Sequence, residues 1–128
     1  MIATATAGGL VGRRLLIVED EALVAMMLED MLAALGCVVV TVAGSVARGL
    51  ALAGDTSLDL DAAVLDVNLG GEKVYPVAQA LTAHGIPFIF STGYGLAGIA
   101  PDFAGIPALA KPYNAKALQA ALVSVLGA

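Results

Sequence analysis

Short apolar runs recur along the chain, and segments of a different hydrophobic period separate them. The runs are RLLIV (residues 14–18), CVVVTV (37–42), DAAVLDV (61–67), PFIFS (87–91) and PALA (107–110). Continuous apolar runs of this length are typical of parallel strands that are covered on both faces. The pattern therefore predicts a buried sheet of parallel strands.

Between these runs, apolar residues return every three or four positions, as they do on one face of an α-helix. The pattern predicts helices over residues 21–35, 46–53, 74–84 and 115–126. Ser45 and Asn114 can cap the second and fourth of these helices at their N-termini. Gly36 and Gly85 can end the first and third. A strand followed by a helix, repeated, predicts an α/β fold with right-handed crossovers and helices on both faces of the sheet.

Two segments depart from this alternation. The stretch GYGLAGIAPDFAGI (93–106) contains four glycines and Pro101, which is poor material for a helix. We expect a short or irregular, mobile segment there instead of a regular helix between the fourth and fifth strands. The chain also opens with a weakly patterned stretch that contains Gly8 and Gly9. Residues 1–12 are expected to form a flexible arm, and residues 13–128 a single domain.

Composition narrows the class of protein. The 128 residues are 59% hydrophobic and 13% charged, which excludes disorder as a description of the whole chain. The apolar stretch 31–47 has no charged residue, but it contains Gly36 and Gly44 and changes its period midway, so it does not predict a membrane span. The start of the chain lacks the basic region of a signal peptide, and we expect a cytoplasmic protein that does not bind membranes.

Charge and cysteine content argue against a nucleic-acid-binding protein and against a disulfide-stabilised one. The net charge of −5 and the scattered arginines argue against nucleic acid as a partner. Cys37 is the one cysteine in the sequence, so an internal disulfide is impossible. Because Cys37 opens an apolar run, we expect it to be a small core residue.

Polar side chains follow four of the predicted strands, each at the point where the strand ends. They are Glu19 with Asp20, Asp66, Ser91 with Thr92, and Lys111, after the first, third, fourth and fifth runs. The carboxyl ends of parallel strands meet at one edge of a sheet, so these groups should converge there. Converging carboxylates repel one another, and a divalent cation with oxygen ligands, such as Mg²⁺, relieves that repulsion.

This set of groups suits a phosphoryl group. A metal ion and Lys111 can neutralise charge on phosphoryl oxygens, and the hydroxyl of Thr92 can donate a hydrogen bond. Asp66 ends the central strand and is the expected nucleophile, which would attack phosphorus in line and form an aspartyl phosphate. The main-chain carbonyl of Asn68 can supply another metal ligand.

Four short motifs in order carry a family resemblance: VED (18–20), LDVN (65–68), STG (91–93) and KP (111–112). Each motif is weak alone, but together they resemble the receiver domain of bacterial two-component response regulators over residues 14–126. The resemblance implies a flavodoxin-like, doubly wound sheet of five parallel strands in the order 2-1-3-4-5. It also implies Mg²⁺ as cofactor and a histidine kinase as the source of the phosphoryl group.

The resemblance assigns roles at the metal site. It implies that Glu19 and Asp20 are the acidic pair, with Asp20 the more direct Mg²⁺ ligand. It implies that Asp66 is the phosphoacceptor and a metal ligand, and that Asn68 completes the metal site through its main-chain carbonyl.

The resemblance also assigns the switch residues. It implies that Thr92 is the switch hydroxyl, that Gly93 leaves phosphorus accessible, and that Lys111 binds phosphate. In this family the bond before Pro112 is usually cis. Receivers commonly carry an aromatic residue three positions before the lysine, where this chain has Ala108, so the movement of the threonine cannot be coupled to that ring.

The stretch FSTGYG (90–95) is similar to a subgroup whose fourth strand ends Phe-Ala-Thr-Gly. Members of that subgroup tend to have an irregular fourth helix and work with histidine kinases of the HWE and related types. Tyr94 in this stretch, like Tyr113 after the KP motif, fits the rim of the site and the core equally well.

The sequence therefore predicts a stand-alone receiver that assists its own phosphotransfer and dephosphorylation and signals through protein contacts. A homodimer through the last helix and fifth strand is also compatible with the pattern. One alternative is a receiver-like interaction module that works without phosphorylation, which Ala108 keeps open. A Mg²⁺-dependent phosphohydrolase is disfavoured, because Asn68 stands where such enzymes place a second acid.

Overall fold

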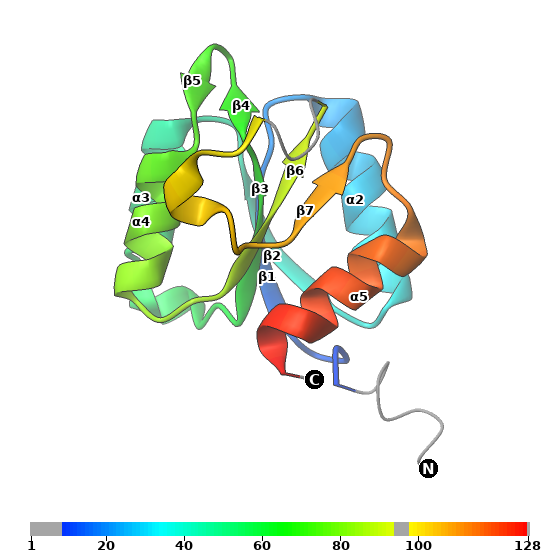
Figure 1. Ribbon diagram of the computed structural model, residues 1–128. Coiled ribbons are helices and arrows are strands. Elements are labelled where there is room, and N and C mark those ends of the chain that lie inside the picture. Colours follow the sequence, from blue (N-terminus) through cyan, green and yellow to red (C-terminus); the bar gives the residue numbers. More distant parts are fainter. Residues whose placement is uncertain (1–8, 94–97, 128) are drawn as a thin grey trace.

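The structure is a computed structural model that describes residues 9–93 and 98–127. A parallel sheet forms its centre, with strands in the order β2-β1-β3-β6-β7 (Figure 1). The strands are β1 (Arg14–Val18), β2 (Val38–Ala43), β3 (Ala62–Asp66), β6 (Phe88–Thr92) and β7 (Ala108–Ala110). Counted along the chain, this is the order 2-1-3-4-5, so the predicted doubly wound, flavodoxin-like sheet is confirmed.

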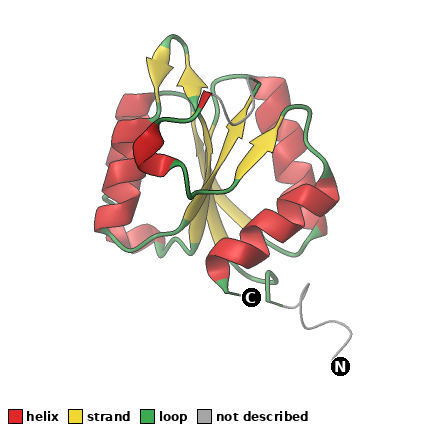
Figure 2. Cartoon of the chain, in the orientation of Figure 1, coloured by secondary structure: helices red, strands yellow, loops and turns green. Residues whose placement is uncertain are grey.

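Helices cover both faces of the sheet. They are α2 (Ala22–Ala34), α3 (Val46–Ala53), α4 (Tyr75–Ala83) and α5 (Ala115–Leu126). Figures 1 and 2 show α3 and α4 on one face and α2 and α5 on the other. Ser45 and Asn114 cap α3 and α5, each by accepting a hydrogen bond from a backbone N–H three residues on, at 3.1 Å. Within the described parts of the chain, none of the helices combines the length and hydrophobicity needed to cross a membrane.

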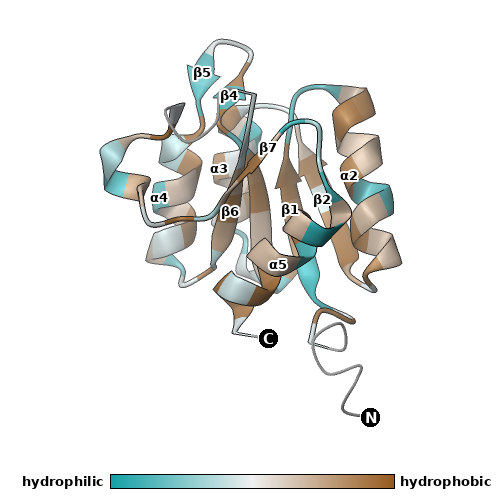
Figure 3. Cartoon of the chain, turned by 45° about the vertical axis from the view of Figure 1, so that its right-hand side comes forward, coloured by the Kyte–Doolittle hydropathy of each residue, from teal (hydrophilic) through white to brown (hydrophobic). Residues whose placement is uncertain are grey.

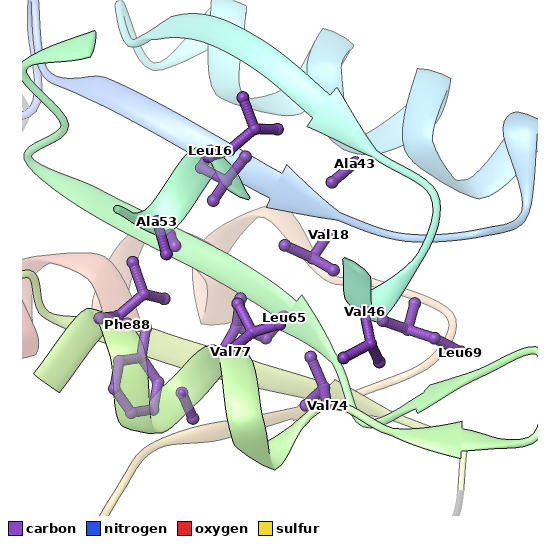
Figure 4. Packing of buried hydrophobic residues seen from close by; sticks show 14 of the residues in the cluster. Leu16, Val18, Ala43, Val46, Ala53, Leu65, Leu69, Val74, Val77 and Phe88 are labelled. Carbon is purple, nitrogen blue, oxygen red and sulfur yellow. The ribbon is translucent and has the colours of Figure 1, made fainter. Parts of the chain in front are cut away.

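The inner strands β1, β3 and β6 bury side chains on both faces, which is why they read as continuous apolar runs. On the α3 and α4 face, Leu16, Leu65 and Phe90 are fully buried in one cluster, part of which Figure 4 shows. On the α2 and α5 face a second cluster forms around residues such as Leu28 and Leu122. Its members include Cys37, whose expected place in the core is confirmed.

A small hairpin follows β3, and the hydrophobic pattern did not predict it. Its strands, β4 (Asn68–Leu69) and β5 (Glu72–Lys73), pair antiparallel across Gly70 and Gly71. Both glycines have positive φ, 54° and 91°, a backbone conformation that glycine adopts without strain. Strands of two residues are too short to show a period, so only the glycine pair marked the turn.

The described residues of the segment before β7 include a 3₁₀ turn, η4 (Pro101–Phe103), and no α-helix, as expected for its glycine-rich sequence. Tyr75 fixes this turn against the rest of the domain. Its ring stacks on Phe103 with 5.2 Å between centroids, and its hydroxyl donates to the carbonyl of Gly98 and accepts from the N–H of Ala100. Residues 94–97, including Tyr94, lie outside the described residues. A further 3₁₀ turn, η2 (Thr56–Leu58), precedes β3.

The apolar residues of α2 exceed what one buried face can hold. Leu28 and Leu32 are fully buried, whereas Leu23, Met26 and Met27 are 75%, 59% and 47% exposed. Met26 and Met27 therefore do not fill the core, although they lie on a helix with an apolar buried face. In Figure 3 the upper turns of α2 carry the brown colour of hydrophobic residues.

Part of the expected N-terminal arm contacts the bottom of the sheet. Leu10 is fully buried, and the thiol of Cys37 lies 3.4 Å from its carbonyl oxygen. Gly12 donates a backbone hydrogen bond to the carbonyl of Gly36 at 2.8 Å. Residues 1–8 of that arm lie outside the described residues.

Two helix-ending glycines provide a matched test of this packing. Gly36 and Gly85 follow α2 and α4 with φ of 88° and 70°. A Cβ on Gly85 would meet nothing within 4 Å, whereas one on Gly36 would lie 2.8 Å from Cγ2 of Val11 and 3.2 Å from its Cα. Gly85→Ala should lower the free energy of unfolding by about 1 kcal/mol, the usual cost of a left-handed residue, and Gly36→Ala by roughly twice that. Urea unfolding measures both, and equal losses would show that residues 9–12 do not pack as described.

Candidate functional site

The candidate site lies at the edge where the parallel strands end, at the top of Figure 1. The register aligns the strand ends closely: Val18 pairs with Leu65, Asp66 with Ser91, and Thr92 with Ala110. The backbone N–H of Lys111 extends the last pairing by donating to the carbonyl of Thr92 at 3.1 Å. The polar residues predicted for this edge therefore come from neighbouring strands at nearly the same height.

Three carboxylates meet there. Glu19, Asp20 and Asp66 each offer an oxygen, and these oxygens all lie within 4.8 Å of one another. Glu19 and Asp66 are buried, at 3% and 5% exposure, while Asp20 is exposed. Each accepts a backbone hydrogen bond. Glu19 accepts from the N–H of Glu21 at 3.1 Å, Asp20 from that of Gly70 at 3.0 Å, and Asp66 from that of Asn68 at 3.4 Å.

Lys111 supplies positive charge to this cluster. Its Nζ lies 3.1 Å from Oε1 of Glu19 and donates a hydrogen bond to Oδ2 of Asp66 at 3.1 Å. Oε1 of Glu19 is buried, and its contact with Lys111 partly offsets its negative charge. Burial lowers the pKa of Lys111, but the hydrogen bonds and charges of Glu19 and Asp66 outweigh burial and raise that pKa above its ordinary value. The ammonium group is therefore charged at any physiological pH.

One lysine does not fully compensate the buried carboxylates. Burial raises the pKa of Glu19 to about 7, although hydrogen bonds from the Glu21 backbone and from Lys111 oppose the shift. The atoms that could bind a metal ion are all carboxylate oxygens. Asp20 is exposed, so one side of this set is open to water. Such a set fits a hard divalent cation that keeps part of its hydration shell, as Mg²⁺ does.

A cavity of about 360 Å³ opens beside the carboxylates. It is lined by Glu21, Asp66, Asn68, Gly93 and Lys111. A Cβ added to Gly93 would meet nothing within 4 Å, so the glycine leaves this entrance open. The cavity can hold a tetrahedral oxyanion with Asp66 on one side and Lys111 on the other.

The remaining predicted residues also lie at this edge. Thr92 ends β6 and is 2% exposed. The backbone N–H of Asn68 points to Oδ1 of Asp66 at 3.4 Å, and its side-chain oxygen accepts from Lys73 at 2.6 Å. The Lys111–Pro112 peptide bond is cis, as the resemblance implied.

The sequence pattern missed two side-chain pairs at the edge. Lys73 reaches Asn68 because the β4–β5 hairpin places the two residues opposite each other. The hydroxyls of Ser91 and Tyr113 share a buried hydrogen bond of 2.6 Å, so Tyr113 is both a core residue and a neighbour of the rim. A serine in the otherwise apolar run PFIFS was the available signal for the second pair.

A flavodoxin-like sheet with an acidic cluster and a lysine at its carboxyl edge defines a class, the receiver domains. The chain belongs to the receiver-domain family of response regulators. It is similar to SdrG from Sphingomonas melonis Fr1, whose solution structure shares 45% sequence identity with a TM-score of 0.79. That alignment covers 91% of this chain and 98% of SdrG.

Two further solved structures are similar. The BeF3-activated conformation of SdrG, from Pseudomonas melonis Fr1, shares 46% identity over 88% of this chain and 95% of that one, with a TM-score of 0.75. The response regulator PhyR from Brucella abortus shares 29% identity with a TM-score of 0.80. That alignment covers 98% of this chain and 52% of PhyR. Comparisons with protein-family models and with curated proteins returned no match.

The acidic cluster should couple cation binding to stability. Mg²⁺ at ten times its dissociation constant should raise the free energy of unfolding by about 1.4 kcal/mol, because only the folded chain brings the carboxylates together. Asp20→Asn should lose most of this gain. Glu21→Gln, which removes an exposed carboxylate outside the cluster, should keep it. Thermal unfolding with and without Mg²⁺ measures the effect, and equal gains in all three proteins would contradict a site at Glu19, Asp20 and Asp66.

Proposed function

We propose that this receiver domain accepts a phosphoryl group from a histidine kinase onto Asp66, with Mg²⁺, and signals through protein contacts. The observation that carries the proposal is the partly buried Lys111 ammonium, which lies 3.1 Å from both Glu19 and Asp66 and lines a cavity. An ion pair that only stabilised the core would have no need of the open cavity or of a third carboxylate.

Asp66 is the nucleophile of the proposed reaction. One of its carboxylate oxygens attacks the phosphorus of a phosphohistidine, the P–N bond breaks, and the imidazole leaves with the electron pair. The product is an acyl phosphate on Asp66. Water later attacks the same phosphorus, which restores the carboxylate and releases inorganic phosphate.

The neighbours of Asp66 bind the transferred group. Lys111 moves its hydrogen bond from the carboxylate to a phosphoryl oxygen, and the hydroxyl of Thr92 donates to another. Glu19, Asp20 and Asp66 with the main chain of Asn68 would hold Mg²⁺, whose charge would offset that of the phosphoryl oxygens.

We place the contact with the kinase that donates the phosphoryl group on the surface beside the cavity. A second cavity of about 320 Å³ lies next to the first and shares Glu21 and Lys111 with it. Met27 lines this second cavity, and Leu23 and Met26 are exposed on the same helix. A kinase helix that presents phosphohistidine to Asp66 would cover these flexible apolar side chains. The similarity of FSTGYG to the Phe-Ala-Thr-Gly subgroup supports a kinase of the HWE type, in the cytoplasm.

The output is proposed to involve the segment after Thr92. Residues 98–106 of this segment contain no α-helix or strand, and Tyr75 contacts them through Phe103 and Ala100. Because β7 carries Ala108 and no aromatic ring, a rearrangement driven by Thr92 must act through this segment. A segment with little regular structure can change its surface at a small cost in free energy.

Intact mass tests the proposal. Wild type incubated with Mg²⁺ and acetyl phosphate should gain one phosphoryl group, and Asp66→Asn should gain none, because the amide is not a nucleophile at this site. Asp59→Asn, an exposed position away from the rim, is the matched control and should behave as wild type.

The same measurement should be repeated with the phosphorylated catalytic core of an HWE-type kinase. If neither donor labels the wild type while both label a control receiver, the proposed function is wrong. The phosphorylation-independent interaction module then becomes the better description.

A further inference from the structure

The hydrogen bond between Ser91 and Tyr113 has no role in the proposed chemistry. It is 2.6 Å long, and both residues are buried, at 0% and 8% exposure. Neither residue lines the cavity beside Asp66. Ser91 stands where the Phe-Ala-Thr-Gly motif has alanine, so the bond belongs to this chain and not to the motif. The proposed chemistry therefore does not explain why two hydroxyls are buried beside the site.

Ser91 lies beside the proposed phosphoacceptor in the sheet. It pairs in register with Asp66 on the neighbouring strand. Strand side chains alternate between faces, so Asp66 and Ser91 share the face of Val64 and Ile89. Those two residues belong to the α2 and α5 cluster, which also contains Tyr113. The shared hydrogen bond therefore lies on the same face as Asp66, directly beside it in the sheet.

Tyr113 lies close to Lys111 in the sequence. Tyr113 follows Lys111 by two residues, in the connection between β7 and α5 (Figure 1). The backbone N–H of Lys111 is bonded to the carbonyl of Thr92, and the side chain of Tyr113 is bonded to Ser91. Two consecutive residues of β6, Ser91 and Thr92, thus bond this connection at Tyr113 and at Lys111. Asn114 then begins α5, which fixes the far end of the connection.

We propose that Tyr113 is a positioning residue, which acts through its hydrogen bond to Ser91 to hold the Lys111 ammonium against Asp66. The consequence for phosphotransfer rests on the proposed function. Without the bond between Ser91 and Tyr113, the backbone of the connection after β7 can shift. A shift of the Lys111 backbone would move its ammonium group away from Asp66. Loss of the correct geometry slows reactions that depend on aligned charges.

Three variants separate positioning from simple stabilisation. Ser91→Ala and Tyr113→Phe each remove one hydroxyl and leave the other buried without its partner, so both should unfold more easily. The double variant removes both hydroxyls and keeps the shape, so its stability should recover toward that of wild type. Tyr75→Phe is the matched control, since it removes a hydrogen-bonded tyrosine hydroxyl that contacts the segment before β7.

The first measurement is independent of phosphorylation. In protein with ¹⁵N-labelled lysine, the Lys111 ammonium held by Glu19 and Asp66 should give a signal protected from exchange with water. Both single variants and the double variant should lose this protection to a similar extent, while Tyr75→Phe should keep it. Equal protection in all five proteins would overturn the proposal, whether or not Asp66 accepts a phosphoryl group.

The second measurement is the rate of phosphorylation at saturating Mg²⁺ and acetyl phosphate. All three variants should be slower than wild type by roughly tenfold, with the double variant no slower than the singles, because the same bond is lost in each. The affinity for Mg²⁺ should not change, since the carboxylates are untouched. A rate that recovers in the double variant together with stability would overturn positioning and leave a structural role. Wild type that gains no phosphoryl group from acetyl phosphate or from the kinase would refute the proposed function and leave the ammonium signal to decide this inference.

Discussion

The rest of the site depends on one ammonium group placed among buried carboxylates. Lys111 neutralises part of the charge of Glu19 and Asp66, which come from different strands and would otherwise repel each other. A buried pair of this kind is costly to desolvate, and breaking it leaves an unpaired charge. Its presence at an open cavity therefore points to use of the charges and not to stabilisation of the fold.

The fold supplies this arrangement through register. Parallel strands that end at the same height bring Asp66, Ser91 and the backbone of Lys111 together, although they are far apart in sequence. The hairpin after β3 adds a further constraint, because the N–H of Gly70 holds Asp20 at the rim. The buried strands keep the carboxylates from moving apart, so a bound cation can lower their repulsion without a change of fold.

Local patterns made much of this predictable. Strand runs, helix periods and cap residues such as Ser45 and Gly36 are encoded within a few residues of the element they define. The rim groups were predictable because each directly follows a strand. The Ser91–Tyr113 bond was not, since it depends on which side chains face each other across the sheet. The exposure of Met27 was also not predictable, because an apolar residue next to a buried face looks the same in sequence as one within it.

The central claim is that this edge is built to hold a phosphoryl group between Asp66 and Lys111. Beryllofluoride mimics a phosphoryl group bound to a carboxylate, so the most direct test is a two-dimensional NMR titration of wild type and Asp66→Asn with Mg²⁺ and beryllofluoride. The account predicts saturable binding by wild type alone, with the largest shifts at Asp66, Asn68, Thr92 and Lys111. Absence of binding by wild type, or equal binding by Asp66→Asn, would contradict it.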